Sequence, residues 1–135
     1  MLVSAIALAG GGARATVGSC GAFSGGLMAL SAGLCPRSEA LSDKELAALE
    51  KARTKYYKFR DWFIKRYGGV SCSIVQWKLY GRSFNLSSEK ETAELRKLQK
   101  RLGFNCELVI AEVAAKVMQM LVQGPGGKNT KGFSR

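Results

Sequence analysis

The sequence predicts an all-α protein, a single compact helical domain of about five to six helices. Its 135 residues are the length of one domain. Several stretches place apolar residues at helical spacing between capping residues and glycines, and no stretch has a convincing strand pattern. We therefore expect residues 1–123 to form one helical domain that holds every cysteine, and residues 124–135 to form a flexible basic tail.

The first two expected helices are apolar and are separated by a glycine-rich segment. Residues 2–8 predict a short buried helix. Residues 10–18 predict a flexible turn whose backbone amides could approach a ligand closely, because glycine lacks a side chain. Residues 20–34 interleave Ala, Gly and Ser with larger apolar residues, which favours a tightly packed helix that ends before Pro36.

The longest expected helix covers residues 42–67. Ser42 followed three residues later by Glu45 is a capping-box pattern, and apolar and aromatic residues then recur at helical spacing. The pair Gly68 and Gly69 ends this helix.

Three shorter helices are expected after the glycine pair. Residues 72–80 follow a tight turn, and Ser88 with Glu91 opens a helix over residues 88–102. Residues 106–122 carry a continuous apolar face and form the last helix.

The apolar start of the chain is not interpreted as a secretory leader. No positive charge precedes the apolar residues 1–9, and the glycines at 10–12 interrupt the run well before the ~20 residues of a membrane span. We therefore expect no membrane span and a cytoplasmic location, where thiols stay reduced.

Four cysteines and no histidine limit the chemistry. Cys-His catalysis, histidine-ligated zinc and Cys-x-x-Cys-His haem attachment each lack a necessary residue, so no haem is expected. The cysteines are separated by 14, 36 and 33 residues, which disfavours a zinc ribbon. A thiolate, a disulfide or an all-cysteine metal site remains.

Three of the cysteines, Cys20, Cys72 and Cys106, fall at expected helix starts. The partial positive charge of a helix N-terminus favours thiolate over thiol, which increases both reactivity and metal affinity. The alternative is that each cysteine is a small buried apolar residue, since free cysteine is often buried.

Residues 18–28 resemble the central motif of a family of redox-active proteins named for the pattern C-GCAxxG-C-C. The order that follows is also similar: a long helix ending at residues 63–68, then Cys72, then Asn105 and Cys106 before a last helix. The resemblance extends from about residue 5 to residue 121.

The resemblance implies a helical redox domain. A related domain occurs in the split-Soret cytochromes, where the cysteines have been associated with an iron-sulfur centre, although the haem part does not carry over here. By this resemblance Cys20, Cys72 and Cys106 would be the redox residues, by thiol-disulfide exchange or as metal ligands of a possible iron-sulfur cluster. An unidentified redox partner protein would exchange electrons with them.

The glycine turn and its neighbours are the candidate contacts of a cofactor. Gly18 and Gly21 flank Cys20, and Arg14 beside the turn could stabilise a thiolate or an anionic ligand. A solvated surface arginine is the alternative for Arg14.

The chain departs from the family pattern at its start. Family members carry an earlier helix with a first cysteine, so either the start is truncated or Cys35 supplies the missing thiol. With neither, a four-thiolate cluster would need an outside ligand or a second subunit, and the exposed apolar surface would favour a homodimer.

Two other functions remain open. One is nucleic-acid binding. The net charge is +11, and residues 51–66 combine basic residues with Tyr56, Tyr57, Phe59 and Trp62, a mixture that could engage phosphates and bases. We disfavour it, because an amphipathic helix normally carries charge on its wet face and aromatics in its core. The other function is a partner-binding helical module with inert cysteines, in which Trp62, Trp77 and Tyr80 are core or interface anchors.

Overall fold

The computed structural model describes residues 7–35 and 42–123. Within these residues the chain is all-α, as predicted, with an isolated antiparallel bridge and no strand. The expected helix over residues 2–8 and the expected tail over residues 124–135 lie largely or wholly outside the described residues. Among the described helices, none has the combination of length and apolar character that crossing a bilayer requires.

The described residues form five helices, and each begins within one residue of its expected start. They are α1 (Gly21–Leu34), α2 (Asp43–Tyr67), α3 (Cys72–Tyr80), α4 (Glu89–Leu102) and α5 (Glu107–Val122).

Capping residues explain these boundaries. Ser42 accepts a hydrogen bond from the backbone N–H of Glu45, and the Glu45 carboxylate accepts one from the backbone N–H of Ser42, which completes the capping box. Gly68, Gly81 and Gly103 end α2, α3 and α4 with φ of 86°, 75° and 74°, the left-handed conformation that glycine adopts without strain.

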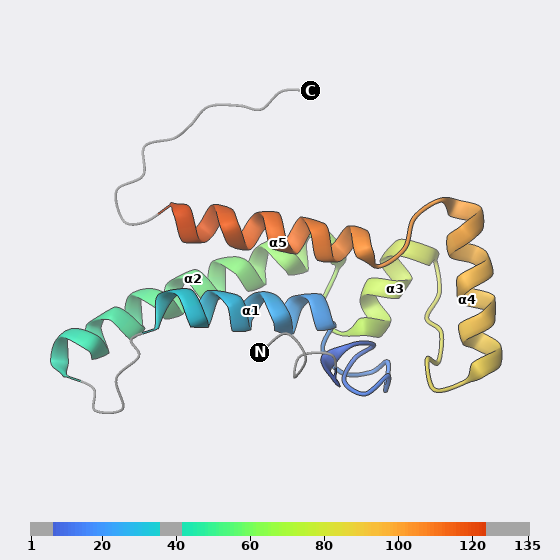
Figure 1. Ribbon diagram of the computed structural model, residues 1–135, viewed down its shortest axis with the longest axis horizontal. Helices are drawn as coiled ribbons and strands as arrows, with labels where there is room; N and C mark the ends of the chain where they lie inside the picture. The colour runs from blue at the N-terminus through green and yellow to red at the C-terminus, as the bar shows by residue number, and fades with distance from the viewer. Residues whose placement is uncertain (1–6, 36–41, 124–135) are drawn as a thin grey trace, which may run out of the picture.

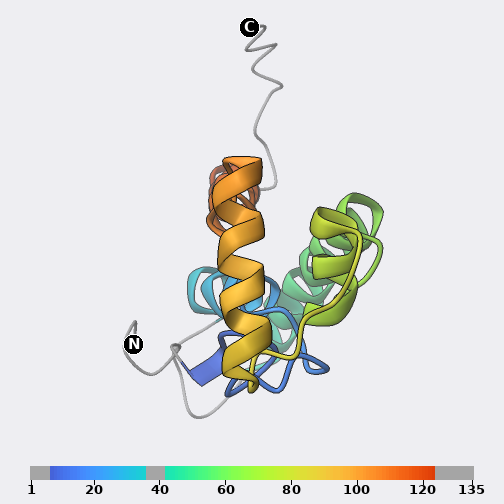
Figure 2. The ribbon, with the colours of Figure 1, turned by 90° about the vertical axis from the view of Figure 1, so that its right-hand side faces the viewer.

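Three long helices run side by side and two shorter ones lie at one end. In Figure 1, α1 and α5 run in the same direction while α2 runs in the opposite direction behind them, and α3 and α4 occupy the right-hand end. Figure 2 looks onto that end and shows α4 crossing it, with α3 to one side. The N-terminal ends of α1 and α5 therefore point toward the end of the molecule where α3 and α4 lie.

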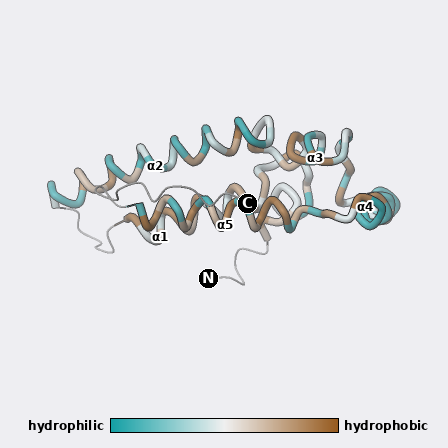
Figure 3. Tube along the Cα trace, turned by 90° about the horizontal axis from the view of Figure 1, so that it is seen from above, coloured by the Kyte–Doolittle hydropathy of each residue, from teal (hydrophilic) through white to brown (hydrophobic). Residues whose placement is uncertain are grey.

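The core lies between α1, α2 and α5. Phe59 and Phe63 of α2 are fully buried, and the ring of Phe23 from α1 stacks on Phe59 with 5.6 Å between ring centroids. Gly26 makes this close packing possible, because a Cβ there would lie 2.6 Å from Cζ of Phe59. Figure 3 shows that α1 and α5 are largely apolar, whereas polar residues dominate α2 and α4.

The segment before α1 is a hydrogen-bonded turn rather than the flexible one expected. Residues 10–14 and residue 16 all have positive φ, and Ala13, Arg14 and Thr16 among them are not glycine. Such residues carry strain that the surroundings must offset. Here the backbone of Thr16 accepts a bond from Ser73, and the carbonyl of Arg14 accepts one from the Ser87 hydroxyl.

Candidate functional site

Three of the cysteines lie at the N-terminal ends of α1, α3 and α5, toward the end of the molecule that α3 and α4 occupy (Figure 1). Cys20 and Cys106 are the N-cap residues of α1 and α5, and Cys72 is the first residue of α3. The prediction that these three cysteines lie at helix starts is confirmed. Neither N-cap cysteine uses its side chain for capping, so both sulfurs are free for other contacts.

An antiparallel bridge joins the chain segments that carry Cys20 and Cys72. Ser19 pairs with Ser71, the backbone N–H of Cys20 donates to Val70 O at 2.7 Å, and that of Cys72 donates to Gly18 O at 2.8 Å. Residues that flank such a pair point to the same side of the bridge. Cys20 and Cys72 are therefore diagonal neighbours, a relation with roughly 7–8 Å between Cα atoms and less between Cβ atoms.

The third thiol, that of Cys106, lies close enough to interact electrostatically with the other two. Burial raises the pKa of Cys72, and negative charge on Cys20 and Cys106 raises it further. Burial likewise raises the pKa of Cys106, with a further contribution from Cys20. The sequence led us to expect thiols made acidic by helix N-termini, but for Cys72 and Cys106 the cost of burying a thiolate is the larger effect.

Two side chains of α3 contact the sulfurs of this cluster. Gln76 Nε2 donates to Cys72 Sγ at 3.6 Å, and the Tyr80 hydroxyl lies 3.6 Å from Cys106 Sγ. Gln99 donates to the Tyr80 hydroxyl at 3.0 Å. Cys72, Gln76 and Tyr80 are four residues apart in turn, so one face of α3 presents all three to the site.

Gln76 was missed in the sequence analysis. The signal that could have found it is its position four residues after Cys72 in an expected helix, where side chains are neighbours. Tyr80 was considered only as an anchor of the core or of an interface. Trp77, considered as an anchor of the core or of an interface, is 60% exposed and so does not lie in the core.

Two side chains of α2, Arg66 and Tyr67, hold the carboxylate of Glu112 on α5. Tyr67, whose hydroxyl donates to Glu112, is close enough to Cys20 for a thiolate there to contribute to its raised pKa, although burial is the main cause. Arg66 makes two hydrogen bonds to the same carboxylate at 2.9 and 2.6 Å, which lower the pKa of Glu112.

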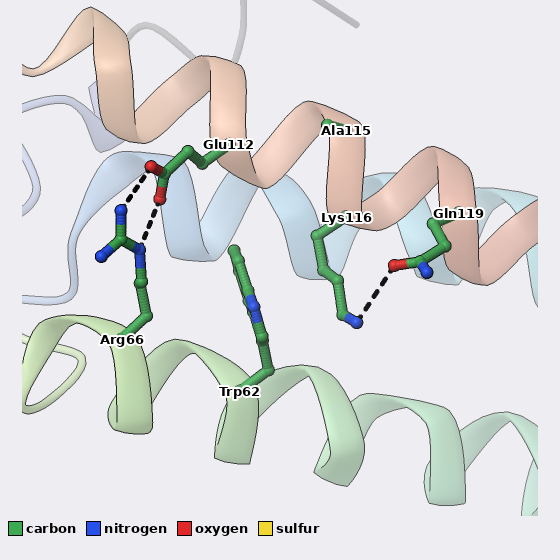
Figure 4. Close-up of a pocket in the computed structure, with 6 residues that line it drawn as sticks. All are labelled: Trp62, Arg66, Glu112, Ala115, Lys116 and Gln119. Atoms are coloured by element: carbon green, nitrogen blue, oxygen red, sulfur yellow. Dashed lines mark hydrogen bonds and ion pairs between the residues drawn. The ribbon is translucent and has the colours of Figure 1, made fainter. Parts of the chain in front are cut away.

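A shallow groove of about 510 Å³ lies outside this carboxylate, between α2 and α5. Figure 4 shows the ion pair of Arg66 with Glu112 at one end and the ring of Trp62 standing beside it. The six lining residues include no cysteine: Trp62, Arg66, Glu112, Ala115, Lys116 and Gln119.

The glycines around Cys20 allow the chain to approach itself. A Cβ on Gly18 would lie 2.0 Å from the carbonyl oxygen of Gly11, and one on Gly21 would lie 2.9 Å from that of Leu8. Arg14, the third residue expected near a cofactor, is exposed and donates to Thr92 of α4 at 3.0 Å. In the described residues these positions shape the turn that carries Cys20, and their role toward a ligand stays a prediction.

Cys35 is not brought to the other three cysteines. It follows the last residue of α1, so the whole helix separates it from Cys20, roughly 20 Å at 1.5 Å per residue. Its Sγ lies 3.3 Å from the Ser31 hydroxyl and 3.0 Å from that of Tyr56. These hydrogen bonds lower the pKa of Cys35, and the one with Ser31 has the larger effect.

The donors near the cluster do not assemble a four-thiolate site. Within residues 7–35 and 42–123, no group of three or more Cys, His, Asp or Glu side chains has an arrangement that could hold a metal ion. A cluster ligated by four cysteines needs one more thiolate than Cys20, Cys72 and Cys106 supply, and Cys35 is at the other end of α1. The described residues therefore do not fit an iron-sulfur cluster by themselves.

These observations define a class of protein: a small helical domain with three cysteines at helix N-termini. A family model described as "Putative redox-active protein (C_GCAxxG_C_C)" matches residues 1–120, and the chain belongs to this family. The resemblance found in the sequence is thereby confirmed. No curated protein and no solved structure gives a significant match.

Proposed function

We propose that this protein is a thiol-disulfide redox protein in which Cys20 and Cys72 form a reversible disulfide. The observation that carries the proposal is the antiparallel bridge of Ser19 with Ser71, which holds both cysteines on one side of two directly hydrogen-bonded segments. Closing the S–S bond then needs side-chain rotation and a small approach of the backbone, since bridged Cα atoms are usually 4.4–6.8 Å apart.

The exchange transfers two electrons and two protons. The Cys20 thiolate attacks a disulfide of the partner, which forms a mixed disulfide and releases one partner thiol. The Cys72 thiol then loses its proton and attacks Cys20 Sγ, which closes the intramolecular disulfide and releases the second partner thiol. We assign the first attack to Cys20 because burial raises the pKa of Cys72.

The surface beside the site favours a protein as the redox partner. Trp77 is 60% exposed and lies one turn after Ser73, whose backbone N–H bonds to the turn that leads to Cys20. Exposed tryptophan is enriched among the anchors of protein interfaces.

Nucleic-acid binding receives less support from the arrangement of α2. Phe59 is fully buried, and the ring of Trp62 lies against it with 5.7 Å between centroids. These two rings therefore contribute to the core, and Tyr57 is the exposed aromatic of that segment. This is the amphipathic arrangement expected of a helix that covers a core.

The test is to equilibrate the purified protein with oxidised glutathione, alkylate the remaining thiols and map the disulfides by mass spectrometry. We expect one intramolecular disulfide between Cys20 and Cys72, formed with two electrons per chain. A map with no such disulfide would contradict the proposal. Stoichiometric iron and acid-labile sulfide in protein purified without oxygen would indicate instead that the cysteines hold an iron-sulfur cluster.

A further inference from the structure

We propose that Gln76 is a positioning residue that sets the reduction potential of the Cys20–Cys72 couple by donating a hydrogen bond to Cys72 Sγ. This inference rests on the proposed function, because it concerns the same pair of thiols. The amide of Gln76 lies one helical turn from Cys72, with Nε2 at 3.6 Å from the sulfur.

The orientation of the Gln76 amide follows from its second partner. The backbone N–H of Phe84 donates to Gln76 Oε1 at 2.6 Å. A backbone N–H can only donate, so the oxygen of the amide must face it and the NH₂ group must face the sulfur. The reversed amide would place two donors against each other at Phe84. Gln76 is therefore fixed as a hydrogen-bond donor to Cys72.

Burial keeps water from the NH₂ group of Gln76, so water cannot replace the sulfur as its acceptor. Gln76 is 1% exposed and is one of only two buried polar residues among those described, the other being Thr16. A buried N–H that loses its acceptor costs about 1–3 kcal/mol. The sulfur of Cys72 is thus the acceptor that makes an amide tolerable at this position.

The same network reaches the segment that carries Cys20. The carbonyl of Phe84 accepts a hydrogen bond from the Thr16 hydroxyl at 3.2 Å, and the carbonyl of Thr16 accepts one from the backbone N–H of Ser73 at 2.9 Å. Gln76 and Thr16 thus bind the backbone N–H and the backbone carbonyl of the same residue, Phe84, in the α3–α4 connection. They differ in that Gln76 contacts a sulfur and Thr16 does not.

The direction of the effect follows from the charge on sulfur. A donor stabilises the electron-rich sulfur of the reduced state more than that of the disulfide, so it makes the disulfide easier to reduce. Removing the donor should shift the equilibrium with glutathione toward the disulfide by between about twofold and tenfold, in line with one ordinary hydrogen bond. For this two-electron couple a tenfold change is about 30 mV.

The experiment compares Gln76→Met with Thr16→Val in redox buffers of reduced and oxidised glutathione. Methionine keeps the length of the side chain and removes the donor. Thr16→Val removes a hydroxyl that donates to the Phe84 carbonyl and accepts from the Leu86 N–H, and it touches no sulfur. The fraction of the Cys20–Cys72 disulfide is measured by alkylation and mass spectrometry, and the stability of each variant is measured by thermal unfolding.

We expect both variants to lose stability and only Gln76→Met to shift the glutathione equilibrium. Equal equilibria in wild type and Gln76→Met, or an equal shift in Thr16→Val, would overturn the inference and leave the proposed function intact. A wild-type protein that forms no Cys20–Cys72 disulfide would overturn both. If Gln76→Met does not fold, the side-chain amide resonances of Gln76 in the wild type decide: they should move on oxidation, and unchanged resonances would refute the contact with sulfur.

Discussion

The two ends of α1 carry a cysteine each, and their surroundings differ in every respect that matters for thiol chemistry. Cys20 at the N-terminal end is buried and has two further thiols near it. Cys35 at the C-terminal end is half-buried and has two hydroxyl groups near it instead, whose hydrogen bonds lower its pKa. Burial raises the pKa of Cys72 and Cys106.

This contrast separates two properties of a cysteine, a lowered pKa and the proximity of a second thiol. The cysteine with the lowered pKa, Cys35, is at the end where no second thiol lies near it in the described residues. Burial makes Cys72 and Cys106 poor nucleophiles until a partner or a local opening reaches them. In this fold, the candidate redox site is therefore marked by convergence of thiols rather than by their acidity.

The largest expected effect comes from removing the thiol at the N-terminal end of α1, with removal of the thiol at the C-terminal end as the control. Cys20→Ser should abolish the intramolecular disulfide formed with oxidised glutathione, because no other described thiol is bridged to Cys72 through the backbone. Cys35→Ser should leave that disulfide unchanged, since the length of α1 separates Cys35 from the cluster. Peptide mapping of both variants measures this, and loss of the disulfide in Cys35→Ser would erase the distinction between the two ends.

A smaller effect, on stability, is expected from substituting a glycine near Cys20. Gly18→Ala should lower the free energy of unfolding by about 3 kcal/mol, because its Cβ would collide with the Gly11 carbonyl, and overpacking costs typically 1–3 kcal/mol. The matched control is Gly25→Ala inside α1, where a Cβ meets nothing within 4 Å and alanine should add about 0.5–1 kcal/mol. Urea unfolding measures both changes. Equal stabilities for the two variants would show that the close approach at Gly18 is not required.

The smallest expected effect concerns the pH at which each thiol reacts. Thiolate is the reactive form, so the alkylation rate of Cys35 should rise at a lower pH than that of an ordinary thiol, and the rates of Cys72 and Cys106 at a higher pH. Tyr56→Phe removes a donor to Cys35 and should move its profile to higher pH. Site-resolved iodoacetamide labelling over a pH series measures this. If the alkylation rate of Cys35 rose at a higher pH than that of Cys72, the comparison of the two ends would be reversed.

The helices and the positions of three cysteines along them could be predicted because their signals are local. Ser42 and Glu45 are three residues apart, and Gly68 directly follows the helix it ends, so a short window of sequence contains each boundary. The placement of Cys20, Cys72 and Cys106 at helix starts follows from the same windows.

The relations that make a site of these cysteines could not be predicted from such windows. The pairing of Ser19 with Ser71 spans 52 positions of sequence and involves two serines with no strand pattern around them. The acceptor role of Phe84 toward Thr16 is a backbone property and leaves no trace in residue identity. The positive φ at Ala13 and Arg14 was also invisible, because neither residue type signals that conformation.

The left-handed turn before α1 also determines when the site can assemble during folding. Besides its local hydrogen bonds, it makes others to residues 50 to 78 positions further along the chain, from Val70, which accepts from Cys20, to Thr92, which accepts from Arg14. Loops of this length close only after local helices have formed, because their closure costs entropy that few contacts repay early. We therefore expect the strained turn to form late in folding, so that Cys20 comes beside Cys72 only after the helices are in place.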